Sequence, residues 1–224
     1  MALILNIDTA GENAIISICE ETKVLASVIN NNQKDHAAFL QPAIKNLFNQ
    51  IDIPINKLNA ISVASGPGSY TGLRVGMASA KGLCYALKIP LITISTLEIM
   101  ATFTINKIQN IKGFYCSIID ARRMEVFTAV YDARLTEIIK PVAMVVDSNS
   151  FKDILKKNTV FFYGSGVAKC KKIIENANAI FLEEEMNAQP MALLSYKNFK
   201  ENNFADVAYA TPFYLKEFYT TAKV

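Results

Sequence analysis

The sequence predicts an α/β protein made of two related lobes, and three observations lead to that fold class. Short apolar strands and amphipathic helices alternate along the chain. A glycine-rich turn from Gly66 to Gly76 joins a buried strand to a helix. Ile7-Asp8-Thr9-Ala10 and Ile119-Asp120-Ala121-Arg122 each end a strand on an aspartate, as in a duplicated fold that holds a nucleotide between its halves. Chance explains so short a repeat equally well.

The first half of the chain is expected to form three strands, then a helix, a strand, a helix and a strand. The three opening strands have the spacing of an antiparallel meander. From Ala37 to Ile51 apolar residues recur at helical intervals. The predicted strands are 3–8, 14–19, 23–29, 60–65 and 91–94, and the predicted helices are 37–51 and 73–87.

The second half starts the pattern again, with a strand that ends at Asp120 and its hairpin partner. The predicted strands are 114–119, 125–131 and 160–163, and the predicted helices are 151–157, 167–176 and 191–200. No linker rich in Pro, Gly or Ser divides the chain, so we expect two lobes that share an interface. The N-terminal lobe is placed at 1–102 and the C-terminal lobe at 103–224, with the last residues able to pack back on the first lobe.

Composition narrows the class of protein. Of the 224 residues, 51% are hydrophobic and 19% charged, which is ample for a large core. The net charge of +3 is too small to indicate a nucleic-acid-binding protein by itself. No apolar run reaches the roughly 18 residues that span a membrane. Four scattered cysteines form no Cys-x-x-Cys pair, so we expect a cytoplasmic protein whose cysteines are small core residues.

The glycine loop has two possible uses. It lacks the Gly-Lys-Ser/Thr ending with which a P-loop holds phosphate and magnesium, and its spacing differs from the dinucleotide-binding fingerprint. On spacing alone, these glycines fit a packing turn and an anion-binding turn equally well. If a nucleotide binds, the candidate contacts are Asp8, Thr9, Gly66, Gly68, Ser69 and Asp120.

The helix after this loop carries a ridge of small residues, because Gly72, Gly76 and Ala80 are spaced four apart. Such a ridge lets another element approach closely. That element is either this chain's own sheet or first helix, or a second subunit, and the spacing fits both.

Carboxylates and histidines limit the possible chemistry. Asp8 and Asp120 are candidates for a magnesium-nucleotide site, or else ordinary turn residues at strand ends. His36 is the only histidine of the sequence and precedes an apolar helical run. Our first interpretation is that it belongs to the start of that helix. No catalytic residue and no metal ligand set is assigned.

Gly66 to Arg74, with Ile7-Asp8-Thr9, residues 120–126 and Pro212-Phe213-Tyr214-Leu215, resembles the bacterial TsaB (YeaZ) family. The resemblance runs nearly end to end. It implies the actin-like fold of acetate and sugar kinases, Hsp70 and actin, with two lobes of related topology. It also implies a part in placing threonylcarbamoyl on the adenosine next to the tRNA anticodon.

The resemblance further implies a scaffold without catalysis of its own. The catalytic paralogue of this family, TsaD, holds a metal with a His-x-x-x-His pair, and Thr96 and Met100 stand at those positions here. Neither is a good ligand for that metal. The implied partners are TsaD, as a heterodimer, and the ATPase subunit TsaE, with tRNA contacted indirectly and a homodimer formed by the chain alone. The implied partner-binding residues are His36, Leu40, Ile44, Tyr70, Thr71, Gly72, Arg74, Val75, Gly76 and Ala80.

No cofactor is expected for the chain alone, although ATP or ADP with Mg²⁺ could sit at the interface with the partner. The alternative is an autonomous Mg²⁺-dependent kinase or nucleotide hydrolase of the same fold, which would use Asp8 and Asp120. That alternative predicts ATP turnover by the purified chain.

Overall fold

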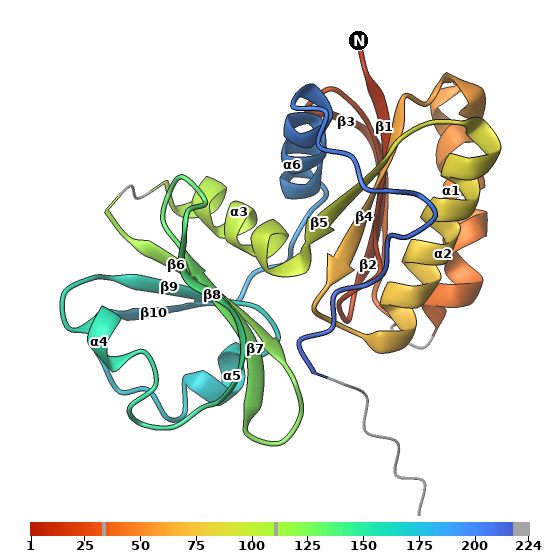
Figure 1. Cartoon of the computed structure of the whole chain (residues 1–224). Coiled ribbons are helices and arrows are strands. Elements are labelled where there is room, and N and C mark those ends of the chain that lie inside the picture. Colours follow the sequence, from red (N-terminus) through yellow and green to blue (C-terminus); the bar gives the residue numbers. More distant parts are fainter. Residues whose placement is uncertain (33–34, 110–111, 217–224) are drawn as a thin grey trace, which may run out of the picture.

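The structure, a computed structural model, describes residues 1–32, 35–109 and 112–216. Two five-stranded sheets form two lobes, and helix α3 (Thr96–Ile108) connects them (Figure 1). The first sheet has the strand order β3-β2-β1-β4-β5 and the second β10-β9-β6-β7-β8. In both sheets the strands on one side of the central strand are joined by antiparallel pairings, and those on the other side are joined by parallel pairings. The predicted duplication is therefore confirmed by topology.

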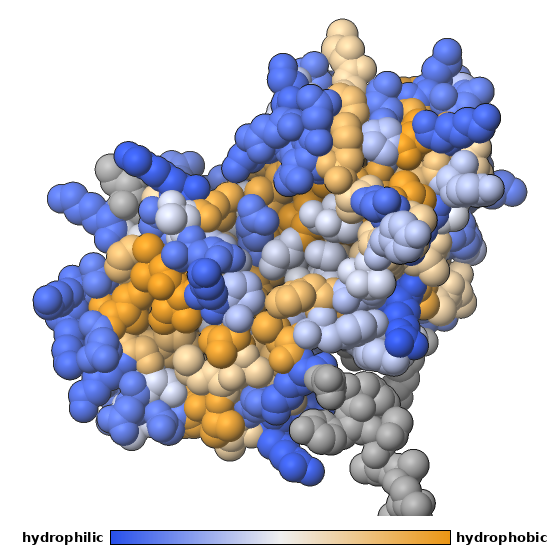
Figure 2. Space-filling model, viewed as in Figure 1, coloured by the Kyte–Doolittle hydropathy of each residue, from blue (hydrophilic) through white to orange (hydrophobic). Residues whose placement is uncertain are grey.

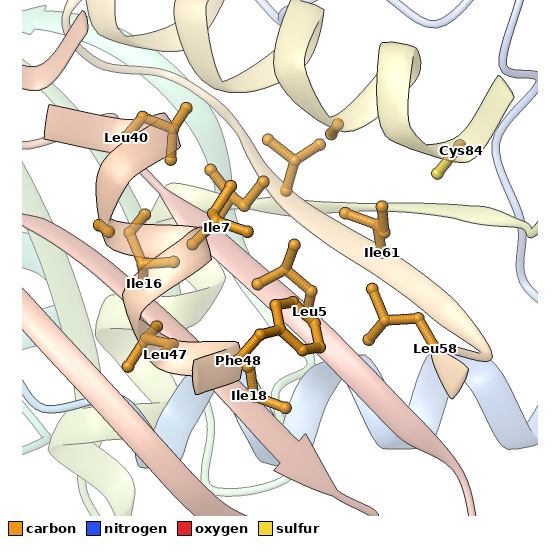
Figure 3. Packing of buried hydrophobic residues seen from close by; sticks show 14 of the residues in the cluster. Leu5, Ile7, Ile16, Ile18, Leu40, Leu47, Phe48, Leu58, Ile61 and Cys84 are labelled. Carbon is orange, nitrogen blue, oxygen red and sulfur yellow. The ribbon is translucent and has the colours of Figure 1, made fainter. Parts of the chain in front are cut away.

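The first sheet is covered on both faces, which explains why its central strand is apolar almost throughout. Its strands are β1 (Leu3–Asp8), β2 (Ala14–Glu20), β3 (Lys23–Asn30), β4 (Ala60–Gly66) and β5 (Leu91–Ser95). Helices α1 (His36–Ile51) and α2 (Tyr70–Leu87) cover one face, and a short 3₁₀ turn, η2 (Ile55–Lys57), leads into β4 (Figure 1). Leu5, Ile16 and Ile61 of the strands meet Leu40 and Phe48 of α1 in the core between them (Figure 3).

The second lobe is built on β6 (Phe114–Asp120), β7 (Glu125–Tyr131), β8 (Glu137–Val145), β9 (Val160–Tyr163) and β10 (Ala179–Leu182). Helix α3 packs on one face of this sheet. The short helices α4 (Lys152–Leu155) and α5 (Val167–Cys170) cover the other. Hydrophilic residues cover most of the rim of the molecule, whereas apolar residues gather on the second lobe (Figure 2).

Sequence patterns were least informative at the edges of the second sheet. Strands β8 and β10 were not predicted, and the helices expected at 151–157 and 167–176 are each only four residues long. Strand β8 carries Lys140 and Pro141, residue types that belong to an edge strand and interrupt the alternation of apolar residues. The helix at 167–176 ends early, in a series of turns before Asn176.

The end of the described chain returns to the first lobe. Helix α6 (Gln189–Lys200) packs on the face of the first sheet opposite α1 and α2 (Figure 1). Residues 203–216, here called the C-terminal strap, then cross β5, α2 and the glycine loop. In the strap Ala205 pairs with Leu91, and the Phe213 N–H donates to the Ser65 carbonyl at 2.7 Å. The division at 102 and 103 stays a prediction, but α6 and most of the strap lie on the first lobe, whereas Lys216 at the end of the strap pairs with Glu125 of β7.

Two further expectations concern the chain as a whole. Cys19, Cys84, Cys116 and Cys170 are all buried and free, as the sequence predicts. Within the described ranges no helix is long and apolar enough to cross a membrane.

Candidate functional site

Two cavities open between the lobes where the central strands end. The first, of about 410 Å³, lies among the β1–β2 turn, the start of α3, the β9–α5 turn and residues 182–186. We call it the acidic cavity, because its charged lining residues in the described structure are all carboxylates: Asp8, Glu12, Glu183, Glu184 and Glu185. The second lies between the glycine loop and the turn after β6. We call it the basic cavity, because Arg122, Arg123 and Lys169 outnumber its two carboxylates, Asp120 and Glu12, the latter shared with the acidic cavity.

Asp8 forms part of the floor of the acidic cavity and is only 4% exposed. One carboxylate oxygen, Oδ1, accepts a hydrogen bond of 3.0 Å from the Ala10 N–H. Burial raises the pKa of Asp8 to about 6, against the smaller lowering effect of that hydrogen bond. Because Asp8 has no ion-pair partner in the described structure, its charge is compensated only by a backbone dipole.

Thr96 and Met100 also line the acidic cavity, one turn apart on α3. The Thr96 Oγ1 is buried and has no hydrogen-bond partner in the structure as described. Met100 packs against Gly164, where a Cβ would overlap the end of the methionine side chain and the Ile118 carbonyl oxygen. No three His, Cys, Asp or Glu side chains of residues 1–32, 35–109 and 112–216 are grouped so as to hold a metal ion.

Asp120 has a different environment at the equivalent end of β6. Its Oδ1 accepts hydrogen bonds from the Lys169 ammonium and the Arg122 N–H, both at 2.6 Å. The side chains of Lys169 and Asp120 are 19% and 38% exposed. Nearby, Lys216 of the C-terminal strap pairs with Glu125 at 2.6 Å. Asp120 is therefore held as one member of an ion pair.

The glycine loop packs tightly against the β1–β2 turn. A Cβ at Gly68 would overlap the Ala10 carbonyl oxygen, and one at Gly72 would overlap the Thr9 carbonyl oxygen. The Thr9 hydroxyl donates to the Gly72 carbonyl at 2.7 Å, and the Ser69 N–H donates to the Ala10 carbonyl at 2.7 Å. Ser69 also begins α2, since its hydroxyl accepts from the Gly72 N–H at 3.3 Å. Of the two uses left open, the structure shows close packing within the chain.

Gly66 supports the same conclusion from the other side of the loop. Its φ of 111° lies in the region that favours glycine, and a Cβ there would overlap the Phe213 carbonyl oxygen of the strap. Of the candidate nucleotide contacts, Thr9 and Gly66 are therefore occupied in packing, and Gly68 both packs on Ala10 and lines the basic cavity. Asp8 lines the acidic cavity, whereas Ser69 and Asp120 line the basic one.

The small-residue ridge faces this chain's own sheet. A Cβ at Gly76 would overlap the Thr9 hydroxyl, and Gly72, Gly76 and Ala80 are all buried. The prediction of this ridge as a surface for a second subunit is therefore wrong, because β1 and β4 already cover it. His36, Leu40 and Ile44 are buried too, with the His36 Nε2 3.4 Å from the Gly11 carbonyl oxygen.

Four of the predicted partner-binding residues remain accessible. Thr71 and Arg74 are exposed, and Tyr70 and Val75 are partly exposed. The Arg74 guanidinium lies 4.0 Å from the centre of the Tyr70 ring, and its Nε donates to the Tyr214 hydroxyl at 3.1 Å. Their assignment to a partner surface stays a prediction.

Several residues of the cavities were missed by the sequence analysis. The run Glu183-Glu184-Glu185 was visible as three adjacent acids, but only the fold brings it opposite Asp8. Lys169 was part of a predicted helix, and nothing in the sequence indicated that its ammonium meets Asp120, 49 residues earlier.

The comparisons with known proteins agree on one family. Residues 23–221 match the family model of TsaD, tRNA N6-adenosine threonylcarbamoyltransferase. The chain is 33% identical over 220 residues to the tRNA threonylcarbamoyladenosine biosynthesis protein TsaB of Bacillus subtilis, covering 95% of this chain and 93% of that protein.

Solved structures support the fold. YeaZ from Pseudomonas aeruginosa matches with a TM-score of 0.81 at 22% identity, over 96% of this chain and all of that one. An activator of 2-hydroxyisocaproyl-CoA dehydratase from Clostridium difficile, solved with ADPNP, matches with a TM-score of 0.52 at 10% identity, over 90% and 96% of the two chains. The expected actin-like fold with two related lobes is thus confirmed, and the chain belongs to the TsaB (YeaZ) family of tRNA threonylcarbamoyladenosine biosynthesis proteins.

Proposed function

We propose that this chain is a non-catalytic subunit that pairs with TsaD and so supports transfer of threonylcarbamoyl to tRNA. The pairing surface is the outer face of α2 with the adjoining part of α1. The two helices lie side by side and are joined by a hydrogen bond of 3.0 Å from Gln41 to Ser79 (Figure 1). We call this surface the α1–α2 face; its residues are Ala37, Gln41, Thr71, Arg74, Val75, Ala78, Ser79, Gly82 and Ala86.

Gly82 carries the proposal. A glycine in the middle of a helix costs about 1 kcal/mol relative to alanine, so some packing gain is expected in return. Within the described chain, a Cβ at Gly82 would have no neighbouring atom within 4 Å. Ala78, Gly82 and Ala86 are all exposed and spaced four apart, which makes a second small-residue ridge, pointing outward. Such a ridge allows a helix of a partner protein to pack closely against α2.

The cavities support a role without catalysis. Thr96 and Met100 supply the acidic cavity with a hydroxyl and a thioether, neither of which suits a catalytic divalent metal. We propose that TsaE joins through the complex with TsaD, that tRNA is contacted through the complex, and that ATP or ADP with Mg²⁺ binds at the joint surface. Without TsaD the same face would pair two copies of this chain.

The test is Gly82→Arg. An arginine on the α1–α2 face should abolish co-elution with TsaD in size-exclusion chromatography, because it blocks close approach of a helix. The isolated variant should keep its circular dichroism spectrum and its melting temperature, since the position is exposed.

The matched control is Ala177→Arg, which adds the same side chain at an exposed small residue in the second lobe. It should leave co-elution unchanged. Full co-elution of the Gly82→Arg variant with TsaD would contradict the proposed surface. Turnover of ATP by the purified wild-type chain would instead favour the autonomous enzyme.

A further inference from the structure

We propose that the acidic cavity is a binding site for a small organic amine with an apolar body, and not for a nucleotide. The inference concerns the cleft of this chain alone and does not depend on the proposed pairing with TsaD. It rests on the charge of the cavity, on its unpartnered polar groups and on its walls.

The charge of the cavity has one sign. Glu183 pairs with Lys171 at 2.8 Å and Glu184 pairs with Lys107 at 2.7 Å, so these two glutamates are neutralised at the surface. Asp8, Glu12 and Glu185 take part in no ion pair among the described residues. With no lysine, arginine or histidine of the described chain in the lining, a cation is the ligand that this field attracts.

Thr96 points to a ligand independently of that charge, and the incomplete hydrogen bonding of Asp8 agrees with it. The Thr96 Oγ1 has no partner although Thr96 is only 4% exposed, and buried hydroxyls in folded proteins are nearly always paired. Asp8 is equally buried, and in the described structure only its Oδ1 is hydrogen-bonded. An ammonium group, with three donors, can serve the free Asp8 oxygen and the Thr96 oxygen together. At neutral pH the pKa of Asp8, raised by burial to about 6, still leaves most of this carboxylate ionised.

The remaining walls are mostly apolar, with Asn13 and Ser165 as the polar side chains besides Thr96 and Tyr163. Ile15 and Met100 from the first part of the chain face Ile119, Tyr163 and Leu182 from the second lobe. The Tyr163 hydroxyl already donates to the Glu184 carbonyl at 3.1 Å, so its ring is left as a packing surface. A volume of about 410 Å³ is in the range of sites for metabolite-sized ligands. The ligand class is therefore an amine that carries a compact hydrocarbon part.

The fold family implies a nucleotide in this cleft, and the acidic cavity does not fit one. Phosphates are usually held by cationic side chains, which the described lining does not supply, and its carboxylates repel them. The cations of the cleft lie in the basic cavity instead, where Lys169 is already paired with Asp120.

The experiment is a titration of the full chain with cyclohexylamine, its uncharged analogue cyclohexanol, and AMP, followed by calorimetry and by NMR shifts of backbone amides. Cyclohexylamine should bind saturably at neutral pH and shift the amides of residues 8–13 and 96–100. Cyclohexanol should bind at least about tenfold more weakly, because it lacks the charge-assisted hydrogen bond.

Two variants separate binding from folding. Asp8→Asn should weaken cyclohexylamine about tenfold or more, and Thr96→Val, which keeps the shape of the side chain, should weaken it several-fold. Glu175→Gln, at an exposed turn of the second lobe, is the control and should change nothing. Equal binding of amine and alcohol, absence of saturable amine binding, or AMP binding with shifts at residues 8–13 and 96–100 would each overturn the proposal.

Discussion

The corners at Asp8 and Asp120 occupy equivalent places in the two lobes and have opposite electrostatic environments. Each aspartate ends a central strand and each lies against the turn and helix that follow the neighbouring parallel strand. Asp8 is buried without a counter-charge, whereas Asp120 is partly exposed and paired with Lys169.

The difference comes from those following helices. After β4, helix α2 brings glycines against Thr9, so backbone packs on backbone, and among the described residues no side chain is hydrogen-bonded to or ion-paired with Asp8. After β9, helix α5 brings Lys169, whose ammonium reaches Asp120. A duplicated framework thus keeps the position of a carboxylate while one or two residues on a neighbouring helix decide its charge environment.

The largest effect is expected from breaking the backbone contact at the first corner. In Gly72→Ala, the new Cβ would overlap the Thr9 carbonyl oxygen, which cannot move without displacing β1. We expect a loss of about 3 kcal/mol in the free energy of unfolding, measured by urea denaturation. Gly82→Ala, on the same helix, is the matched control and should gain about 0.5–1 kcal/mol, since nothing in the described chain lies near its Cβ. Equal effects of the two substitutions would refute the packing argument.

The second-largest effect is expected at Asp8, which has no counter-charge in the described structure. The folded-state pKa of about 6 lies above the ordinary 3.8, so the folded protein holds this proton more tightly than the unfolded chain. The resulting stability is full below 3.8 and is lost as the pH rises through about 6. Asp8→Asn removes that loss and should be more stable than the wild type at neutral pH by about 2–3 kcal/mol, since each pKa unit corresponds to 1.36 kcal/mol.

Near about pH 4 the Asp8→Asn variant and the wild type should unfold at the same urea concentration, because the carboxyl is then protonated in the folded state. Asp153→Asn is a suitable control, since hydrogen bonding to Lys156 lowers the pKa of this exposed carboxylate, and it should not be stabilised at neutral pH. Destabilisation by Asp8→Asn at neutral pH would mean that Asp8 has a stabilising partner.

The smallest effect is expected at the second corner. Asp120→Asn removes a partly exposed ion pair and should cost about 0.5–1 kcal/mol at low salt, with less effect at high salt. A double-mutant cycle with Lys169→Gln isolates the pairwise coupling from other losses. A coupling indistinguishable from zero would show that Lys169 does not compensate the charge of Asp120, so that the two corners would not differ as described.

Much of the first lobe could be predicted from the sequence, because its strands and helices are long and strongly periodic. The duplication was visible only as two aspartates, but topology shows both at the ends of equivalent strands. Periodicity correctly placed Gly72, Gly76 and Ala80 on one face of a helix. It could not show what that face packs on, since a smooth ridge suits a strand and a second subunit equally well. The acidic cavity was out of reach for a similar reason, because Asp8 and Glu183 meet only through the arrangement of both lobes.

The position of α6 determines the order in which the molecule can be completed during synthesis. Met191 and Leu194 of this helix cover Ile4, Ile92 and Ile94 on one face of the first sheet. The strands of this sheet lie between Leu3 and Ser95 and leave the ribosome well before α6, so this face stays uncovered until α6 has been translated. At about 5–20 residues per second, the wait is several seconds or more. The first lobe is therefore completed only after the second lobe has been translated, and until then the nascent chain exposes apolar surface of its first sheet.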